Sequence, residues 1–499
     1  NVTNKMVFKG NIEYLTENEI GIRLRATQQN PSVLPAESLY AIEHDTMDTT
    51  FRSMYQGLYI YLSARKERRD LLLSQRPPRF DESLDSMISR SEDDFTRIAL
   101  KAKAAQDYFL LIGPPGTGTT SCVLKKMVET FHADKDAQIL LLSYTNRAVD
   151  EICKSLASIA PAVDFIRVGS ELSCDEAYRG HLIENELSSC NRRSEVYERI
   201  RNCRIIVGTV AAISGKPELF RLKHFDVAII DEATQILEPQ LLGILCARGE
   251  DGKDAIDKFV LIGDHKQLPA VVQQNTEQSA IYDESLLSIG LTNLKDSLFE
   301  RLYRNCTATV HRSYDMLCRQ GRMHPEVALF ANRAFYGGRL IPVGLPHQIE
   351  SSDTICRLAF YPSVPEKVGA SAKINYSEAR IVADLAVRIY EDHQADFDES
   401  RTLGIITPYR SQIALIKKEI ESLGIPALNR ILVDTVERFQ GSERDVIIYS
   451  FCVNYPYQLK FLSNLTEEEG VLIDRKLNVA LTRARKQMFI TGVSELLER

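Results

Sequence analysis

Several features that mark other protein classes are absent from this sequence of 499 residues. No apolar run approaches the roughly 20 residues that a membrane-spanning helix needs, so we expect no membrane span. Residues 1–5 are polar and lead into no apolar stretch, so no signal peptide is expected. The sequence has no initiator Met, and we expect an upstream part of the same chain, carrying a further domain, to precede it.

Paired cysteines are also missing: the ten cysteines include no C-x-x-C. Because zinc sites usually use ligands paired at that spacing, the sequence argues against a zinc site built from cysteines, and one around Cys174 and Cys190 is the less favoured alternative. Most cysteines lie in apolar runs, as Cys203 does beside Ile205, and are expected to be core residues of a protein in a reducing compartment. We therefore expect an intracellular protein, cytoplasmic or nuclear.

An excess of basic residues is missing too, since 61 Lys and Arg face 68 Asp and Glu and give a net charge of -7. This balance excludes a protein coated in positive charge, but a local basic channel could still contact nucleic-acid phosphates. The length is too great for one hydrophobic core and predicts two to four domains.

The pattern of apolar residues divides the chain into three parts. Short alternating segments in residues 7–44 predict a small β-barrel, and apolar residues at helical spacing in 48–74 predict a helical stalk. Short apolar runs separated by helical stretches then predict buried parallel strands at 108–112, 138–143, 204–208, 227–230, 259–263, 403–406, 431–434, 446–451 and 488–491. The expected fold is α/β, with an accessory segment over 1–90 and two tandem doubly wound domains over 91–305 and 306–499.

A glycine-rich loop follows the first of these apolar runs. It consists of Gly113, Pro114, Pro115, Gly116, Thr117, Gly118, Thr119 and Thr120. Glycines let backbone N–H groups close on phosphates, and a following helix adds a favourable dipole, so the loop predicts an ATP-binding site. Thr119 stands where the pattern requires a Lys for the β- and γ-phosphates. The alternative is an ordinary Gly/Pro-rich turn between a strand and a helix.

Adjacent carboxylates end the apolar run at 227–230. We expect Asp231 to hold Mg²⁺ together with Thr120, and Glu232 to position and deprotonate the attacking water. Such a pair alone is often a solvated strand end. Downstream of a phosphate loop, the catalytic interpretation is favoured.

Eight further blocks occur in a fixed order: SYTNRAVDEI at 143–152, VGTVAA at 207–212, GDHKQLPA at 263–270, SLFERL at 297–302, GRMHPEVALFANRAFYGG at 321–338, ITPYRSQI at 406–413, VDTVERFQGSERDVI at 433–447 and LNVALTRAR at 477–485. With the phosphate loop they cover almost the whole chain. The sequence resembles superfamily 1 helicases of the branch that includes the nonsense-mediated-decay helicase and the replication helicase-nuclease. The resemblance implies two RecA-like domains, ATP and Mg²⁺ as cofactors, and 5′-to-3′ movement along single-stranded DNA or RNA.

The resemblance also implies individual roles. Gln267 is expected to sense the γ-phosphate, Arg322 and Arg483 to act as arginine fingers, and Glu443 to contact the nucleotide. The residues expected to contact the phosphates and sugars of the strand are Thr145, Asn146, Thr209, Thr407, Tyr409 and Thr435. Tyr409 is equally well interpreted as a packing residue.

Three departures from the family pattern affect these expectations. Gly321 stands where many relatives have Tyr, and the glutamine that reads adenine is missing at the expected spacing near Phe95 or Thr96. Both weaken adenine selectivity. Thr119 leaves two interpretations: a motor whose hydrolysis is impaired by one isolated substitution, or an ATPase-inactive clamp or scaffold that binds nucleic acid. The presence of the other catalytic groups favours the motor.

Overall fold

The computed structural model describes residue 8 and residues 10–24, 39–42, 49–272, 274–309, 311–351, 355–366, 373–468 and 470–498. The chain divides into two compact units, residues 1–52 and 53–499. In the first unit, β1 (Gly10–Leu15) pairs antiparallel with β2 (Ile20–Leu24). This hairpin is the part of the expected barrel that the described residues contain, and the barrel is not confirmed; residues 25–38 and 43–48 lie outside the description.

The helical pattern after residue 48 forms α1 (Thr49–Leu62) and α2 (Lys66–Leu72). A separate stalk is not confirmed, because Ala64, Leu71 and Leu72 are buried in the core beneath the first large sheet. Gly57 of α1 permits a close helix contact: a Cβ there would lie 2.2 Å from the carbonyl oxygen of Pro239 on α11 (Glu238–Leu245).

The first large sheet has seven parallel strands in the order β5-β6-β4-β7-β8-β3-β9. Their bounds are β3 Tyr108–Ile112, β4 Ile139–Ser143, β5 Phe165–Val168, β6 Ile205–Thr209, β7 Phe225–Ile230, β8 Ile256–Gly263 and β9 Tyr314–Met316. We call this sheet and the helices packed on it the first lobe. Because β9 pairs with β3, the first sheet extends beyond the domain boundary that the sequence predicts at residue 305.

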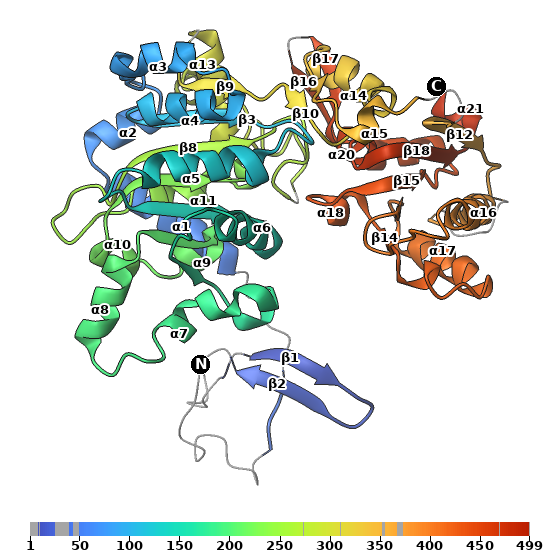
Figure 1. Cartoon of the computed structure of the whole chain (residues 1–499), viewed down its shortest axis with the longest axis horizontal. Helices are drawn as coiled ribbons and strands as arrows, with labels where there is room; N and C mark the ends of the chain where they lie inside the picture. Colours follow the sequence, from blue (N-terminus) through green and yellow to red (C-terminus); the bar gives the residue numbers. More distant parts are fainter. Residues whose placement is uncertain are drawn as a thin grey trace. The chain divides into compact units, whose positions relative to one another are not determined.

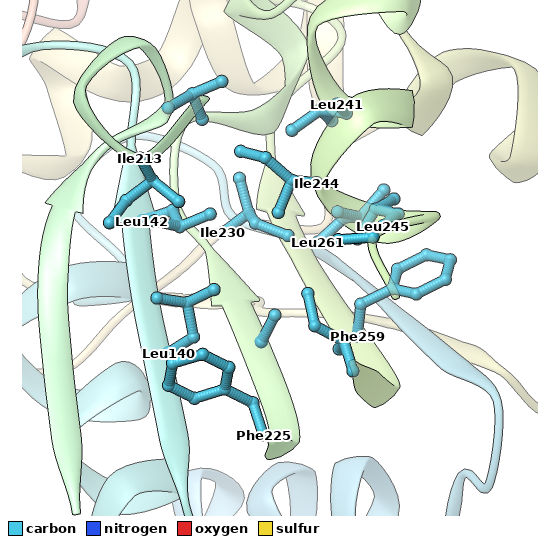
Figure 2. Close-up of a cluster of buried hydrophobic side chains, with 14 of the residues drawn as sticks. Leu140, Leu142, Ile213, Phe225, Ile230, Leu241, Ile244, Leu245, Phe259 and Leu261 are labelled. Carbon is cyan, nitrogen blue, oxygen red and sulfur yellow. The ribbon is translucent and has the colours of Figure 1, made fainter. Parts of the chain in front are cut away.

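Hydrophobic clusters cover both faces of this sheet. On one face, side chains of β4, β7 and β8 meet Ile213 of α9 (Val210–Ser214) and the leucines of α11 (Figure 2). The opposite face is covered by α4 (Asp94–Ala104), α5 (Lys125–His132) and α6 (Asn146–Ala157). Continuous burial on both faces explains why these strands are uniformly apolar.

The second large sheet has five parallel strands in the order β12-β18-β15-β13-β14. Their bounds are β12 Leu358–Pro362, β13 Leu403–Ile406, β14 Leu432–Asp434, β15 Arg444–Ser450 and β18 Ala484–Gly492. One face packs on α16 (Tyr376–Asp392) and α17 (Arg410–Ser422), and the other on α14 (Pro325–Tyr336), α18 (Val436–Phe439) and α20 (Arg475–Leu481). This sheet and its helices are the second lobe.

The remaining elements complete the chain (Figure 1). They are α3 Asp85–Arg90, α7 Ile183–Glu186, α8 Arg193–Asn202, α10 Glu218–Leu222, α12 Glu284–Ser288, α13 Leu298–Ala308, α15 Pro346–Ile349, α19 Leu459–Leu462 and α21 Ser494–Leu497, the pair β10 Arg319–Gln320 with β11 Ile341–Pro342, and the hairpin β16 Leu465–Glu468 with β17 Val471–Asp474. Among them, α8, α10 and α13 add side chains to the core of the first lobe. Within the described residues, no helix combines the length and apolarity needed to cross a membrane. The two α/β domains expected from the sequence are confirmed.

Candidate nucleotide and nucleic-acid sites

A cleft of about 900 Å³ is lined by residues of both lobes. The first lobe contributes the loops that follow β3, β4, β7 and β8, and the second contributes segments near Arg322, Glu443 and Arg483. The cleft thus brings together the expected ATP and catalytic residues, namely Gly113 to Thr120, Asp231, Glu232, Gln267, Arg322, Glu443 and Arg483. It lies at the carboxyl ends of the parallel strands, where α/β sheets usually bind ligands.

The loop after β3 has the backbone conformation that its glycines predict. Gly116 and Gly118 have φ values of 76° and 79°, a region that residues with a Cβ rarely adopt. The chain then enters a π-helical turn (Thr119–Leu124), in which the N–H groups of Cys122 and Val123 both donate to the carbonyl of Gly118 at 3.0 Å. The loop is therefore held by its own backbone at the start of a helical segment.

Thr119 directs its methyl group towards the base of the loop. A Cβ added to Gly113 would lie 2.0 Å from the Thr119 Cγ2. Of the residues described, none hydrogen-bonds the Thr119 hydroxyl, and the side chain brings no charge to the loop. The position that the family pattern gives to a lysine is thus occupied by a short neutral side chain.

Asp231 lies directly opposite the phosphate loop. The Thr120 hydroxyl donates to its Oδ2 at 2.5 Å, and the N–H of Glu232 donates to its Oδ1 at 2.9 Å. Burial raises the pKa of Asp231, although the bond from Thr120 acts in the opposite direction. A hydroxyl beside a carboxylate is the oxygen donor set that Mg²⁺ prefers, so these two residues fit the expected metal.

Glu232 has an unusual backbone conformation and a raised pKa. Its φ is 54°, a left-handed conformation that is strained by about 1–3 kcal/mol in a residue with a side chain. Its Oε2 is buried, and no group in the described part of the chain hydrogen-bonds it. Burial, and then the charge of Asp231, raise the pKa of Glu232 to about 7. A carboxylate with such a pKa suits a general base at neutral pH.

Gln267 connects the two lobes at the cleft. It accepts a hydrogen bond from Arg483 at 2.9 Å and donates from Nε2 to Asp264 at 2.9 Å. Arg483 is buried, and this burial, together with the charge of Arg322, lowers its pKa to about 9. The guanidinium therefore remains charged at neutral pH, in contact with the residue expected to sense the γ-phosphate.

Arg322 is paired with Glu443, with 2.5 Å between Nε and Oε2. Burial acts to raise the pKa of Glu443, but the charge and hydrogen bond of Arg322, together with the charges of Arg485 and Arg483, lower this pKa overall. The adjacent Gly321 donates its N–H to the carbonyl of Gly116 at 2.8 Å. Arg322 therefore stands beside the phosphate loop, with its charge balanced by Glu443.

The six residues expected to contact the strand all follow parallel strands. Thr145 and Asn146 follow β4, Thr209 ends β6, and Thr407, Tyr409 and Thr435 follow β13 and β14. The hydroxyls of Thr145 and Thr209 cap their helices by accepting from Ala148 and Ala212 at 3.1 Å. Thr145 also lines the nucleotide cleft. Their roles towards nucleic acid stay predictions.

Tyr409 is held from behind by polar side chains. Its hydroxyl accepts from Gln458 Nε2 at 3.2 Å, and the Oε1 of Gln458 accepts from the N–H of Asn454 at 2.9 Å. Asn454 in turn accepts from Asn375 at the start of α16 at 2.9 Å. The Tyr409 hydroxyl is therefore held by a hydrogen bond within the second lobe, and a contact between the Tyr409 ring and nucleic acid stays a prediction.

A buried carboxylate lies in the same region of the second lobe. Glu378 accepts from the Ser450 hydroxyl at 2.6 Å and from the N–H of Cys452 at 2.9 Å. Burial raises its pKa from 4.5 to about 7, despite these hydrogen bonds. At a pH between 4.5 and about 7, Glu378 is therefore protonated in the folded lobe, whereas the same residue of the unfolded chain is ionised.

Glu378→Gln is expected to stabilise the protein at pH 8 and to leave its stability nearly unchanged at pH 4. A raised folded-state pKa gives stability that is complete below the unfolded pKa and lost as the pH rises through the folded pKa. The parent should lose on the order of 3 kcal/mol over this window, and the glutamine, which keeps an acceptor oxygen, should not. Melting temperatures of both proteins between pH 4 and 8 test this; a difference that does not depend on pH contradicts it.

Two family models, each described as an AAA domain, match this chain: one over residues 294–495 and the other over 89–198 and 184–275. The chain is 28% identical over 494 residues to the "DNA replication ATP-dependent helicase/nuclease DNA2" of Gallus gallus, with 94% of this chain and 44% of that protein covered. These matches support a superfamily 1 helicase core of the replication helicase-nuclease type. It is also 24% identical over 537 residues to the "DNA polymerase alpha-associated DNA helicase A" of Saccharomyces cerevisiae, covering 92% of this chain and 73% of that one.

This helicase core spans less than half the length of the DNA2 proteins of Gallus gallus and Homo sapiens, 44% in both cases. A solved structure described as a complex of Arterivirus nonstructural protein 10 (helicase) with DNA covers 80% of this chain and 65% of its own, at 16% identity and a TM-score of 0.40. That likeness is too low to establish the fold, which rests on the sheet topology.

Sequence reasoning missed one set of contacts in this helicase core. Tyr336 of α14 donates to Asp264 Oδ2 at 2.6 Å, and Asn478 of α20 donates to the Tyr336 hydroxyl at 2.8 Å and to the carbonyl of Lys266 at 2.7 Å. The three side chains are buried and join the lobes beside Gln267. All three lie inside the ordered sequence blocks, so polar residues within those blocks were the available signal.

Proposed function

We propose that this chain is an ATP-driven motor that binds ATP in the cleft between its lobes and moves along single-stranded nucleic acid. The observation that carries the proposal is the shared lining of the cleft. Phosphate loop, Asp231 and Glu232 come from the first lobe, and Arg322 and Arg483 from the second. Because the catalytic set is divided between the lobes, ATP binding should favour closure of the cleft, and hydrolysis should favour its opening.

The roles of the side chains follow from their positions. Thr120 and Asp231 would hold Mg²⁺, which neutralises phosphate charge when bound. Glu232 would orient the attacking water and accept its proton, while Arg483, through Gln267, would connect the state of the γ-phosphate to the second lobe. Arg322 would add positive charge at the transferring group.

We propose DNA as the strand, because the relatives from Gallus gallus and Saccharomyces cerevisiae are described as DNA helicases. Movement from 5′ to 3′ and an intracellular site of action, nuclear or cytoplasmic, belong to the same proposal and follow from the family resemblance. An upstream domain in the same chain and the use of RNA are further expectations of that resemblance.

Thr119 indicates that this motor hydrolyses ATP more slowly than one with a lysine at that position. A neutral side chain at the lysine position should leave hydrolysis impaired. The same residue is the observation that favours the second candidate, a nucleic-acid-binding clamp or scaffold that does not turn over ATP. The two candidates are separated by a strand-displacement assay on matched DNA and RNA substrates, with Thr and with Lys at position 119. Displacement by the Lys protein supports the motor, and its absence in a folded Lys protein supports the clamp.

Binding to single strands should be independent of base sequence and should weaken steeply with salt. The expected contacts are hydroxyl and amide groups that face phosphate and sugar, so they do not depend on base sequence. The local basic channel expected beside them would neutralise phosphates and so release bound counterions. Fluorescence anisotropy with oligo(dT) and with a mixed-sequence strand, from 50 to 200 mM salt, measures both properties. Affinity that stays flat with salt, or that differs strongly between the two strands, contradicts the prediction.

A further inference from the structure

The nucleotide cleft is lined by more cations than the expected contacts use. Besides Arg322 and Arg483, the lining includes Lys154 and the arginines at 147, 319 and 444. Lys154 lies 4.0 Å from Glu151. Over the described ranges, by contrast, neither Arg147 nor Arg319 forms a side-chain hydrogen bond or ion pair. Free guanidinium groups thus face a cleft whose phosphate loop carries no charge of its own.

Arg147 stands on a helix that is fixed to the phosphate loop. It is the second residue of α6, and the Thr145 side chain caps this helix by accepting from Ala148. Further along α6, the Ser155 hydroxyl donates to the carbonyl of Thr120 at 3.1 Å. The helix that presents Arg147 is therefore anchored to the same turn that carries Thr119.

Arg444 lies close to Arg147 and comes from the other lobe. Burial, and then the positive charge of Arg147, lower the pKa of Arg444. Its Nε is buried, and no acceptor in the described structure reaches it. Two like charges that lie near each other across a cleft repel. No carboxylate of the described residues forms an ion pair with Arg147, although the charge of Glu232 acts on Arg147 and the charges of Asp398 and Glu443 act on Arg444 against this repulsion. A triphosphate is a polyanion that would relieve this repulsion.

We infer that Arg147 supplies to the phosphates of ATP the positive charge that Thr119 does not, and that Arg444 approaches the same phosphates from the second lobe. The inference rests on the proposed binding of ATP in this cleft. A guanidinium suits the role because it is always charged and its planar N–H groups can bind phosphate oxygens in pairs. Arg147 thus preserves the affinity for the triphosphate in place of a loop lysine. It does not reproduce the contact that a loop lysine makes in the transition state.

The test is the equilibrium binding of mant-ATP with Mg²⁺ in the absence of nucleic acid. Arg147→Ala should weaken binding about tenfold, and Arg147→Lys, which keeps the charge, by no more than about threefold. In a Thr119→Lys background the loop supplies the charge, so Arg147→Ala should then change the affinity by less than about twofold. This loss of effect distinguishes a replaced charge from general damage to the cleft.

Arg192→Ala is the matched control, because Arg192 is an exposed arginine at a helix start in the same lobe and lies outside the cleft. Unchanged mant-ATP binding by Arg147→Ala, or an equal loss in both backgrounds, overturns the inference. The inference is also overturned if Arg319→Ala weakens mant-ATP binding, if Thr119→Lys removes that weakening, and if Arg147→Ala has no effect. If the Thr119→Lys protein is an active ATPase and Arg147→Ala leaves mant-ATP binding unchanged in both backgrounds, only the inference fails. If neither the parent nor the Thr119→Lys protein binds mant-ATP, the proposed function fails as well.

Discussion

Thr119→Lys should raise nucleic-acid-stimulated ATPase activity by about a hundred- to a thousandfold. The lysine brings a mobile positive charge to the β- and γ-phosphates, which the threonine hydroxyl is too short and uncharged to supply. A charge-assisted contact made in the transition state is worth on the order of 3 to 4 kcal/mol, which gives this range. Steady-state hydrolysis with saturating single-stranded DNA, and separately with RNA, measures the change.

Binding of the strand provides the internal control for this variant. None of the expected strand contacts lies in the phosphate loop, so affinity for oligo(dT) and the melting temperature should stay close to those of the parent. A Lys variant that is folded and binds the strand but hydrolyses no ATP with either DNA or RNA would falsify the motor and favour the clamp.

Glu232→Gln, made in the Thr119→Lys background, should lower the hydrolysis rate about a thousandfold. The glutamine keeps the shape of the side chain but cannot accept the proton of the attacking water. Mant-ATP affinity should change little, because the change removes a proton acceptor and no phosphate contact. Single-turnover hydrolysis and nucleotide binding, measured on the same preparation, separate the two effects.

Glu176→Gln is the matched control for Glu232→Gln, since Glu176 is an exposed carboxylate of the first lobe outside the cleft. It should hydrolyse ATP at the rate of its Thr119→Lys parent. Equal rates in the Glu232 variant and this control would show that another group accepts the proton.

The sheets could be predicted from sequence where burial is complete. Strands such as β4 and β15 are buried on both faces and appear as continuous apolar runs, which is why their positions were found within a few residues. Three strands of the two large sheets, β5, β9 and β12, were missed because their residues serve other contacts. β5 carries Arg167, which pairs with Asp150, β9 carries Asp315, which pairs with Lys101, and β12 alternates at the sheet edge. Such short, partly polar segments have no periodicity that separates them from loops.

In the candidate site, too, some features could be predicted from the local sequence and others could not. The phosphate loop and the Asp231–Glu232 pair are local in sequence, so their chemistry can be inferred from spacing alone. The bond between Gln267 and Arg483 joins residues 216 positions apart. The family resemblance implied a role for each residue, but it did not imply this bond. The contacts among Asp264, Tyr336 and Asn478 depend on how the lobes pack, and their place inside the ordered blocks was the only local signal for them. That Arg147 has no ion pair among the described residues also depends on this packing.

The two arginines proposed as arginine fingers, Arg322 and Arg483, are connected to the first sheet by segments of very different length. Met316 is paired with Ile112 at the foot of the phosphate loop, and Arg322 follows it by six residues, so this arginine cannot travel more than about 20 Å from that strand. Arg483 directly precedes β18 of the second sheet, and no short segment of chain connects it to the first sheet. When the lobes separate, Arg322 should thus remain a near neighbour of the nucleotide, whereas Arg483 withdraws, and only the latter can report the distance between the lobes.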